Sequence, residues 1–574
     1  MSQRPGRRSQ PGSSETPWLI AGAALALAMA VALIWWGAGL SDSSIREALA
    51  QPDPATLLIE QFSGRVEVTT QQLALFVGGV LLLGVLVVMI AVAGVRSRRG
   101  RSRVDSLARS MARAKDFNDL TEDAQQQEAE KLRAQAAGPG VPLARLVNDQ
   151  RHLRASWEWV QTWIMGPRAG KTSCVCVPQV IETDGPVLAT SNKRDLVDLT
   201  RGPRSEKGVV WVQDPQGLVG EEPNWWWNPL TFVEDMETAE KLADVFISSA
   251  TSAGVKQDAY FESDGKRLLS HMFLAAAVGG RPVTDVFAWS MDPDDSTPVD
   301  VLHTHGAMQQ AEALAQIQQL TPKQRDGVYG TMRPWISVLG NENVMPWIRD
   351  TGEVGRPEFD HRAFAHTTDT IYLISREGGG SARAITAALV MAILTQAERD
   401  AGRQPGGRLS PPLMAVLDEA ANVVRWRDLP DVYSHYGSRG IVVSSFFQSF
   451  VQGVEAFGKE GMRKLWSSAN IRVAGSGLSE DEFLPFLSQL VGDHDVTKRS
   501  ASSGSGRGSG RQVSTSVQRE RILDVSDIGA LPRGRALMFS SGQPTGLLAL
   551  EHFSDKPYAE DVTASQEFYE SRLV

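Results

Sequence analysis

The stretch IMGPRAGKTS, residues 164–173, contains most of a phosphate-binding loop. The pattern is G-x-x-x-x-G-K-[ST], and residues 170–172 match its end. Counting back from them places Met165 where the first glycine belongs, with Gly166 one position later. Either Met165 replaces that glycine, or Gly166-Pro167 begins a loop that is one residue short. Because only glycine adopts positive φ freely, the first alignment predicts a strained turn that Met165→Gly would relieve.

The loop has the residue types that bind a nucleoside triphosphate. Backbone N–H groups at a helix start point at phosphate oxygens, and the helix dipole adds to the attraction. Lys171 supplies a positive charge for the phosphates, and Thr172 supplies a hydroxyl for Mg²⁺. We therefore predict an ATP site, the alternative being a Gly-Lys-Thr turn without a ligand. The predicted nucleotide-binding residues are Gly166, Pro167, Arg168, Ala169, Gly170, Lys171, Thr172 and Ser173.

An acidic pair further along the chain completes a two-part site. The run PLMAVLDE, residues 412–419, predicts a buried strand with Asp418 and Glu419 at its carboxyl end. In P-loop ATPases such an aspartate holds the magnesium shell. We predict that Thr172 and Asp418 bind Mg²⁺ and that Glu419 polarises the attacking water. The alternative is that the pair only caps a helix over the following Ala-Ala-Asn.

The elements around these motifs predict an α/β domain. A strand is expected directly before the loop, a helix after it, and another helix over 381–400. Such alternation indicates a largely parallel sheet that binds ligands at the carboxyl ends of its strands. Residues 234–280 and 306–339 are mainly helical in pattern, which indicates a helical insertion. The expected strands are residues 157–164, 186–190, 209–213, 370–375, 412–417 and 441–446.

Two apolar stretches precede this domain. Residues 18–40 and 73–95 each lack charge over 23 residues, and about 20 apolar residues suffice to cross a bilayer. A cleaved signal peptide would have a shorter apolar region. Arginines lie before the first stretch and after the second, whereas residues 41–72 hold more acidic than basic side chains. The positive-inside rule therefore predicts a multi-pass protein of the cell (inner, cytoplasmic) membrane, with both termini and the catalytic domain in the cytoplasm.

The predicted organisation has five parts. Residues 1–103 are the membrane anchor, and residues 104–150 are a polar connector. The P-loop ATPase domain comprises 151–232 and 340–574, with the helical insertion at 233–339. Residues 498–516, rich in Ser, Gly and Arg, are predicted to be a flexible linker. Its arginines are expected to be solvated, with DNA contact as the alternative.

Composition limits the other functions that the sequence could have. The net charge of −9 argues against a basic DNA-binding coat, but not against a basic channel formed on assembly. The two cysteines, Cys174 and Cys176, form neither a disulfide framework nor a zinc pattern and are expected to pack inside a helix. His303 and His305 are expected to be solvated. Three tryptophans at 225–227 either stack bases or, as we expect, pack beside Asn228-Pro229.

In this order the motifs resemble those of type IV coupling proteins of the TraG/TraD type. The combination of Asp-Glu, Arg-Gly and Gln-Ser at this spacing is the specific part, and the order of features covers nearly the whole chain. The residues that carry the resemblance are the segments 191–196, 214–215, 227–230, 417–422, 438–441, 448–449 and 531–537.

The resemblance implies a RecA-like P-loop fold and a ring-shaped homo-hexamer with ATP between subunits. Gln448 would sense the γ-phosphate. Arg439 would be an arginine finger for a neighbour's site, and an ordinary surface or DNA-contacting arginine is the alternative. The implied partners are DNA with its relaxase or other secreted cargo, the type IV secretion channel, and the lipid bilayer. The helical insertion would recognise the cargo.

Several functions fit these expectations. We predict a membrane-anchored ATPase that recruits relaxase-bound single-stranded DNA and pumps it to a type IV secretion channel during conjugation. The same protein could instead deliver protein cargo, or act as a passive docking receptor if the ATP site is degenerate. A DNA pump of the chromosome-segregation type would have more membrane spans and a C-terminal winged helix, and the sequence indicates neither.

Overall fold

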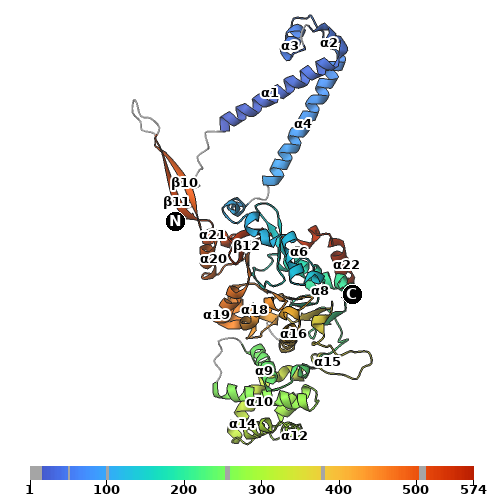
Figure 1. The fold of residues 1–574 in the computed structure, drawn as a ribbon, viewed down its shortest axis with the longest axis vertical. Coiled ribbons are helices and arrows are strands. Elements are labelled where there is room, and N and C mark those ends of the chain that lie inside the picture. The colour runs from blue at the N-terminus through green and yellow to red at the C-terminus, as the bar shows by residue number, and fades with distance from the viewer. Residues whose placement is uncertain are drawn as a thin grey trace, which may run out of the picture. The chain divides into compact units, whose positions relative to one another are not determined.

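The structure is a computed structural model that describes residues 16–49, 52–98, 102–251, 259–376, 382–502 and 512–573. The chain divides into two compact units, Met1–Arg101 and Ser102–Val574. The first unit contains the predicted membrane anchor, and the second contains the rest of the chain (Figure 1).

The described residues of the first unit form four helices: α1 (Thr16–Ser41), α2 (Ser43–Ala48), α3 (Pro54–Phe62) and α4 (Thr70–Arg98). Helices α1 and α4 approach closely at Gly79, where a Cβ would lie 2.5 Å from Cγ2 of Ile34. Nearby, the rings of Trp35 and Phe76 meet edge to face with centroids 4.9 Å apart. The short helices α2 and α3 occupy the segment between the two predicted spans. Their small core consists of Ile45, Leu57 and Val66.

Both predicted spans lie within helices, but the structure describes them to different extents. Among the residues whose side chains it describes, Thr70–Met89 is the one helical stretch long and apolar enough to cross a membrane, and nearly all of it is exposed. The apolar part Ala28–Ser41 of α1 is shorter. The beginning of the predicted span 18–40 falls outside the described side chains.

In the described part of the second unit, the main sheet has eleven strands. The strand order is β2-β1-β13-β12-β9-β3-β8-β7-β4-β6-β5. The seven strands from β9 to β5 are mutually parallel, whereas β2, β1, β13 and β12 add an antiparallel half. The bounds are β1 Val141–Leu146, β2 His152–Ala155, β3 Gln161–Ile164, β4 Val187–Ser191, β5 Val210–Gln213, β6 Thr370–Ile374, β7 Leu413–Leu417, β8 Ile441–Phe447, β9 Ile471–Gly475, β12 Arg535–Ser540 and β13 Gly546–Ala549.

The parallel half confirms the predicted α/β domain. Strands β3 to β8 lie where strands were expected, although β3 begins four residues later than predicted. The register aligns Ile164 with Phe447 on one side of β3 and with Ala474 on the other. It also aligns Thr190 with Leu417. The carboxyl ends of β3, β4, β7 and β8 therefore meet at one edge of the sheet, where parallel sheets bind ligands.

Helices connect and cover the parallel strands. A π-helical turn, Thr172–Cys176, follows the loop and leads into α7 (Val177–Ile181). The later connections are α8 (Asp195–Ser205), α16 (Arg383–Arg403), α17 (Ala420–Val423), α18 (Leu429–Ser438), α19 (Phe450–Ser468), α20 (Phe483–Val491), α21 (Val525–Gly529) and α22 (Ala559–Glu570).

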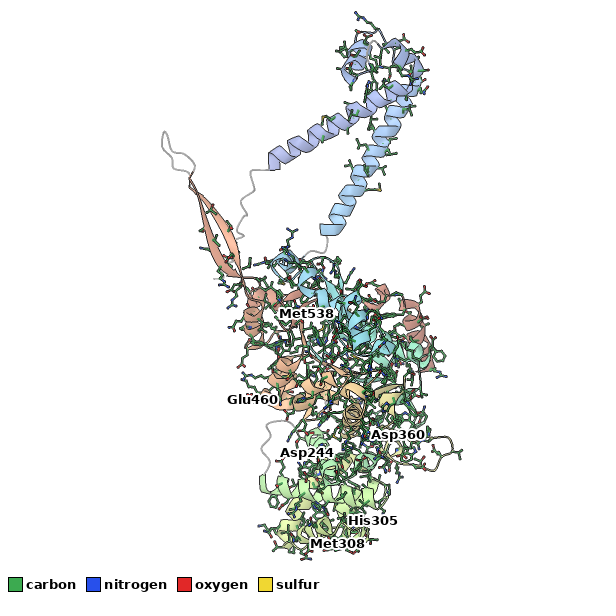
Figure 2. The ribbon with its side chains drawn as sticks, viewed as in Figure 1. Asp244, His305, Met308, Asp360, Glu460 and Met538 are labelled. Atoms are coloured by element: carbon green, nitrogen blue, oxygen red, sulfur yellow. The ribbon has the colours of Figure 1, made fainter. Side chains whose placement is uncertain are left out.

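A run of helices separates β5 from β6, as predicted for the insertion. Its helices α9, α10, α12 and α14 gather together in Figure 1. His305, labelled in Figure 2, lies in this region and is exposed, as expected. The bounds are α9 Met236–Ala250, α10 Ala259–Val278, α11 Thr284–Met291, α12 Thr297–Thr304, α13 Met308–Gln318, α14 Pro322–Ile336 and α15 Met345–Ile348.

The predicted connector over 104–150 is wrong as a separate segment. Its last part is β1, which pairs with β2 and β13 inside the main sheet. Phe117 and Leu120 are fully buried in the core of the second unit. Polar composition concealed this packing, because α6 (Glu122–Lys131) contributes many charges, whereas the buried residues are spread over the whole segment.

The predicted linker over 498–516 is also wrong where the structure describes it. Residues Asp493–Ser502 (β10) and Gln512–Arg521 (β11) pair as an antiparallel hairpin that projects from the body (Figure 1). Val496, Thr497 and Val517 are strand-forming residues that the Ser, Gly and Arg content obscured. Residues 503–511 lie outside the described residues.

Candidate nucleotide site

The predicted phosphate loop lies at the carboxyl end of β3. It begins at Gly166, whose N–H donates to the Ser476 carbonyl at 2.9 Å. A Cβ at Gly166 would overlap the backbone of Gly477, so this position requires glycine for close approach. The positive φ angles of the loop are at Arg168 (59°) and Gly170 (92°). The chain therefore follows the second alignment, a loop that starts at Gly166 and is one residue short.

The expectation of strain at Met165 is wrong. Met165 does not have a positive φ; its N–H donates to the Phe447 carbonyl at 2.9 Å, which extends the pairing of β3 with β8. Its side chain is fully buried and lies against Gly475 of β9. Methionine fills this space as a core residue, and glycine there would relieve nothing.

The acidic pair meets the loop directly. Thr172 Oγ1 donates to Asp418 Oδ2 at 3.2 Å, and Lys171 Nζ bonds to Glu419 Oε1 and lies 3.5 Å from Asp418 Oδ1. Glu419 has a left-handed backbone conformation with φ 58°. Thr190 Oγ1 fixes the preceding peptide by donating to the Asp418 carbonyl at 3.0 Å. A strained non-glycine residue held this firmly is typical of a functional site.

These contacts decide against the capping alternative. Glu419 precedes α17, but its carboxylate does not cap the backbone of that helix. It instead accepts hydrogen bonds from Lys171 and, at 2.8 Å, from Gln448 Nε2 at the end of β8. The sequence thus brings Lys171, Thr172, Asp418, Glu419 and Gln448 together from three strand ends.

Electrostatics at this cluster favour a charged lysine. Burial opposes the charge on Lys171, but Asp418 and Glu419 outweigh it and raise the pKa of the ammonium. Burial raises the pKa of the Asp418 carboxyl, although Lys171 acts in the opposite direction. All three side chains are more than nine-tenths buried. The site therefore holds one cation between two carboxylates, and all three side chains are largely buried.

A cavity of about 550 Å³ opens over the loop. All eight predicted nucleotide-binding residues line it, together with Asp418, Glu419 and Gln448. Its size falls within the range of small-molecule sites. Other lining residues were not predicted as site residues: Ser191, Asn192, Lys193, Asp195, Leu199, His552, Phe553 and Gln566.

Some of these unpredicted lining residues could have been identified from the sequence, and others could not. Asn192 and Lys193 follow β4, so their place at a strand end next to the loop was a usable signal. His552, Phe553 and Gln566 come from beyond β13, more than a hundred residues after Gln448. No spacing rule connects them to the loop.

The donor set suits magnesium. Asp418 Oδ1 is buried and accepts no hydrogen bond, and the Thr172 hydroxyl lies beside the same carboxylate. Mg²⁺ prefers oxygen ligands and usually binds through one or two carboxylates plus substrate phosphates. Thr172 and Asp418 therefore fit the role predicted for them.

Arg439 lies away from the site of its own chain. It precedes the seven-residue strand β8, whereas Gln448 follows it, which separates the two by roughly 23 Å at about 3.3 Å per residue. Its Nη1 donates to the Gly407 carbonyl at 3.2 Å. Any action of Arg439 on a nucleotide must therefore be on the site of another subunit.

The structure shows what surrounds the tryptophans at 225 and 227 and the two cysteines. Trp225 and Trp227 are buried, and Trp225 Nε1 donates to the Val212 carbonyl at 3.0 Å, so these two rings do not stack on bases. Cys174 and Cys176 lie in the turn after the loop, as expected. Burial raises the pKa of the Cys174 thiol and raises that of Cys176 further.

Comparisons of sequence relate the chain to proteins of conjugation. Residues 412–533 match a family described as the TraM recognition site of TraD and TraG. The conjugal transfer protein TraG of Agrobacterium fabrum (strain C58 / ATCC 33970) is 19% identical over 391 residues, or 65% of this chain. The match covers 57% of that relative, less than two thirds of its length.

Solved structures share the fold. The unbound monoclinic form of the bacterial conjugative coupling protein TrwBdeltaN70 has a TM-score of 0.53 at 17% identity, covering 74% of this chain and 91% of that one. The plasmid coupling protein TrwB in complex with ADP and Mg²⁺ has a TM-score of 0.51 at 15% identity, covering 71% and 90%. Together these comparisons confirm the resemblance to the coupling proteins of the TraG/TraD type.

Proposed function

We propose that this chain is a membrane-anchored P-loop ATPase that recruits relaxase-bound DNA and moves it to a type IV secretion channel during conjugation. The contact of Lys171 and Thr172 with Asp418 and Glu419 carries the proposal. These four side chains come from the ends of two strands, β3 and β7, that are not adjacent in the sheet. A chance turn at the loop would not require a matching pair of buried carboxylates.

The contacts suggest how the site works. Lys171 is bonded to Glu419, so the ammonium and the carboxylate neutralise each other. A triphosphate in the loop competes for Lys171 and frees Glu419 Oε1 to accept a proton from water. Gln448 stays within reach of the same oxygen and can respond to the terminal phosphate. Binding and activation are thereby linked through one lysine.

Thr172 and Asp418 would hold Mg²⁺ beside the phosphates. When bound, Mg²⁺ neutralises charge that develops on the phosphate oxygens. Asp418 is suited to this because its carboxylate is buried next to the loop, where Lys171 Nζ lies 3.5 Å from Oδ1. Thr190 keeps that carboxylate in place through the Asp418 carbonyl.

The position of Arg439 supports an assembly with shared sites. Arg439 lies at the amino end of β8, whereas the loop of its own chain lies at the carboxyl ends of the parallel strands. A role as an arginine finger therefore requires a neighbouring subunit. A homo-hexameric ring, with each Arg439 directed at the next site, satisfies that requirement. The Arg439 guanidinium donates to the Gly407 carbonyl through Nη1 and has further N–H donors for such a contact.

Membrane anchorage is supported by the first unit. Most side chains of Thr70–Met89 are exposed, and those from Leu73 onward are apolar, which suits lipid. We propose that α1 and α4 span the cell membrane, with both termini and the second unit in the cytoplasm. Reporter fusions at the N-terminus and after Ser97 should be cytoplasmic, and one near Thr56 should be external. An external fusion at Ser97 would contradict the anchor.

Protein partners are supported by the family match. Because residues 412–533 match the TraM recognition site of TraD and TraG, we propose that this part of the chain contacts a DNA-processing partner. Delivery of protein cargo is the alternative function, since the same ATPase would serve DNA and protein transfer.

DNA-stimulated hydrolysis tests the proposal. The full chain in detergent or nanodiscs should hydrolyse ATP, and single-stranded DNA should raise the rate. A conjugation assay with Lys171→Ala should show loss of transfer while the protein remains in the membrane. Hydrolysis that is indifferent to DNA but raised by a secreted protein would favour the alternative. No ATP binding at all would leave only a docking role.

A further inference from the structure

Two aromatic rings near the C-terminus line the nucleotide cavity. His552 and Phe553 follow β13, with ring centroids 4.4 Å apart and planes tilted by 33°. Among the described residues that line this cavity, they alone carry aromatic rings. His552 is exposed, whereas Phe553 is buried. The segment therefore presents one accessible flat ring with a second ring behind it.

The backbone orients the exposed ring. Ser554 N–H donates to His552 Nδ1 at 3.2 Å, and the Ser554 hydroxyl lies 3.0 Å from the same nitrogen. These contacts hold the imidazole by one edge at the start of a short 3₁₀ turn, Phe553–Asp555. A ring fixed in this way loses little freedom when a ligand stacks on it.

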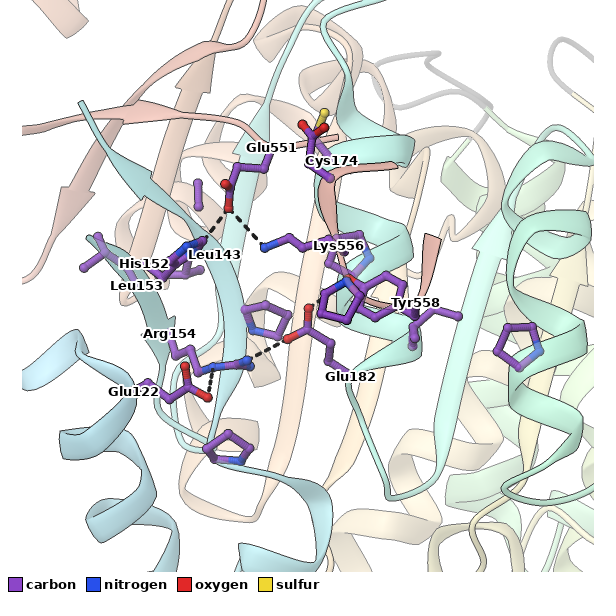
Figure 3. A pocket seen from close by; sticks show the side chains of 18 of the residues that line it. Glu122, Leu143, His152, Leu153, Arg154, Cys174, Glu182, Glu551, Lys556 and Tyr558 are labelled. Atoms are coloured by element: carbon purple, nitrogen blue, oxygen red, sulfur yellow. Dashed lines mark hydrogen bonds and ion pairs between the residues drawn. The ribbon is translucent and has the colours of Figure 1, made fainter. Parts of the chain in front are cut away.

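Ion pairs hold the segment from its other side. Figure 3 shows Glu551 between His152 and Lys556 in a second cavity of about 900 Å³. Tyr558 Oη donates to Glu182 Oε1 at 2.8 Å in the same cavity. The segment is therefore a braced wall that separates two cavities. The side chains that contact Glu551 are Arg145 at 2.8 Å, His152 at 3.0 Å and Lys556 at 3.1 Å.

Helix α22 extends this bracing. Ser565 Oγ accepts from Gly202 N–H at 3.0 Å and donates to the Asp198 carbonyl at 2.6 Å, both on α8. The Arg201 guanidinium lies 3.2 Å above the Tyr569 ring. Gln566 of the same helix lines the nucleotide cavity. Since α8 follows directly after the cavity residues at 191–195, the two helices form one continuous side of the site.

We propose that His552 and Phe553 form the nucleobase-binding wall of this site. The inference rests on the proposed nucleotide-binding function and adds where the base lies. The triphosphate occupies the loop, and the base stacks on His552, which Phe553 supports. Every nucleobase has a π face, so stacking supplies affinity without demanding one particular base. The ligand class is a nucleoside triphosphate, as opposed to a bare polyphosphate.

The test compares ATP with inorganic tripolyphosphate, which has the phosphates but no base. Both are titrated with Mg²⁺ into the full chain in detergent, by calorimetry. We expect His552→Ala to weaken ATP binding roughly tenfold, within the usual range for one stacked base. Tripolyphosphate binding should change by less than about twofold. His552→Phe should restore ATP affinity, and His305→Ala, an exposed histidine in the helical insertion, is the matched control.

The outcomes separate the two proposals. Equal ATP affinity in the wild type, His552→Ala and Phe553→Leu would overturn the base wall, and so would an equal loss for ATP and tripolyphosphate. If the wild type binds neither ligand, the nucleotide function itself fails, and the wall fails with it. Phe553→Leu keeps the buried volume, so the same titrations can be made on this variant if His552→Ala folds poorly.

Discussion

Truncating the Met165 side chain should destabilise the fold and should not improve ATP binding or hydrolysis at the loop. The side chain is fully buried, and a Cβ built on Gly475 would lie 2.6 Å from Met165 Cγ. Replacing a buried methionine with alanine costs about 2–5 kcal/mol. We expect Met165→Ala to lower the free energy of unfolding by about 3 kcal/mol, and Met165→Gly by more, because glycine also frees the backbone.

A double-mutant cycle with Gly475 makes the prediction specific. Gly475→Ala alone should destabilise by about 1–3 kcal/mol, because its Cβ overlaps the methionine. In Met165→Ala/Gly475→Ala the new methyl group enters the space that the methionine has left. The two losses should therefore not add, and the coupling should be about 1 kcal/mol or more in favour of the double variant.

The assay is urea unfolding followed by tryptophan fluorescence, with ATP binding and hydrolysis measured on the same samples. Trp163 of β3, two residues before Met165, is one of the 15 tryptophans that contribute to this signal. Additive losses would refute the packing argument. Faster hydrolysis by Met165→Gly at unchanged stability would instead revive the strained-turn alignment.

Three further perturbations probe the loop, the cysteines and the helical region. Gly170→Val should weaken ATP binding at least tenfold in calorimetry, because Gly170 has φ 92° and a Cβ there would lie 3.0 Å from Cys174 Sγ; unchanged affinity would mean that the loop does not cradle phosphate. Cys174 and Cys176 should react slowly with a thiol reagent near pH 8 and fully in guanidinium chloride, because burial raises the pKa of both thiols; rapid labelling of the folded chain would contradict their packing. His361 is buried and accepts from Trp227 Nε1, and burial lowers its pKa to about 4 from 6.5. The unfolded chain therefore binds the extra proton between these values, and the free energy of unfolding should fall by about 2 kcal/mol from pH 7 to 5; His361→Gln should lack that decrease in urea titrations, and an equal decrease would assign it to other groups.

The parallel half of the sheet was predictable because its strands are continuous apolar runs that end in polar residues. Leu413–Leu417 followed by Asp418-Glu419 is such a run, and Ile441–Phe447 followed by Gln448 comes close to it, with Ser444 and Ser445 as its polar residues. Buried parallel strands need apolar residues on both faces, so the pattern is strong. The meeting of Lys171 with Glu419 followed from the placement of their strands in one sheet.

The other features of the fold and the site could not be predicted, because they depend on contacts between residues far apart in the sequence. Strands β1 and β13 pair across some four hundred residues, so no local pattern in the sequence joins them. The hairpin of β10 and β11 was concealed by a serine-rich composition typical of linkers. Met165 matched a motif position, and only the packing against Gly475 shows that it belongs to the core. His552 enters the cavity solely through the fold of the C-terminal segment.

The most direct test of the central claim separates ATP binding from ATP cleavage in two variants of the full chain. Lys171→Ala removes the ammonium that lies between the two carboxylates and should abolish detectable ATP binding. Glu419→Gln preserves the shape and the neighbouring contacts but removes the base. It should bind ATP with an affinity near that of the wild type and hydrolyse it at least about a hundredfold more slowly. Turnover at the wild-type rate in Glu419→Gln would show that the acidic pair is structural and that this account of the site is wrong.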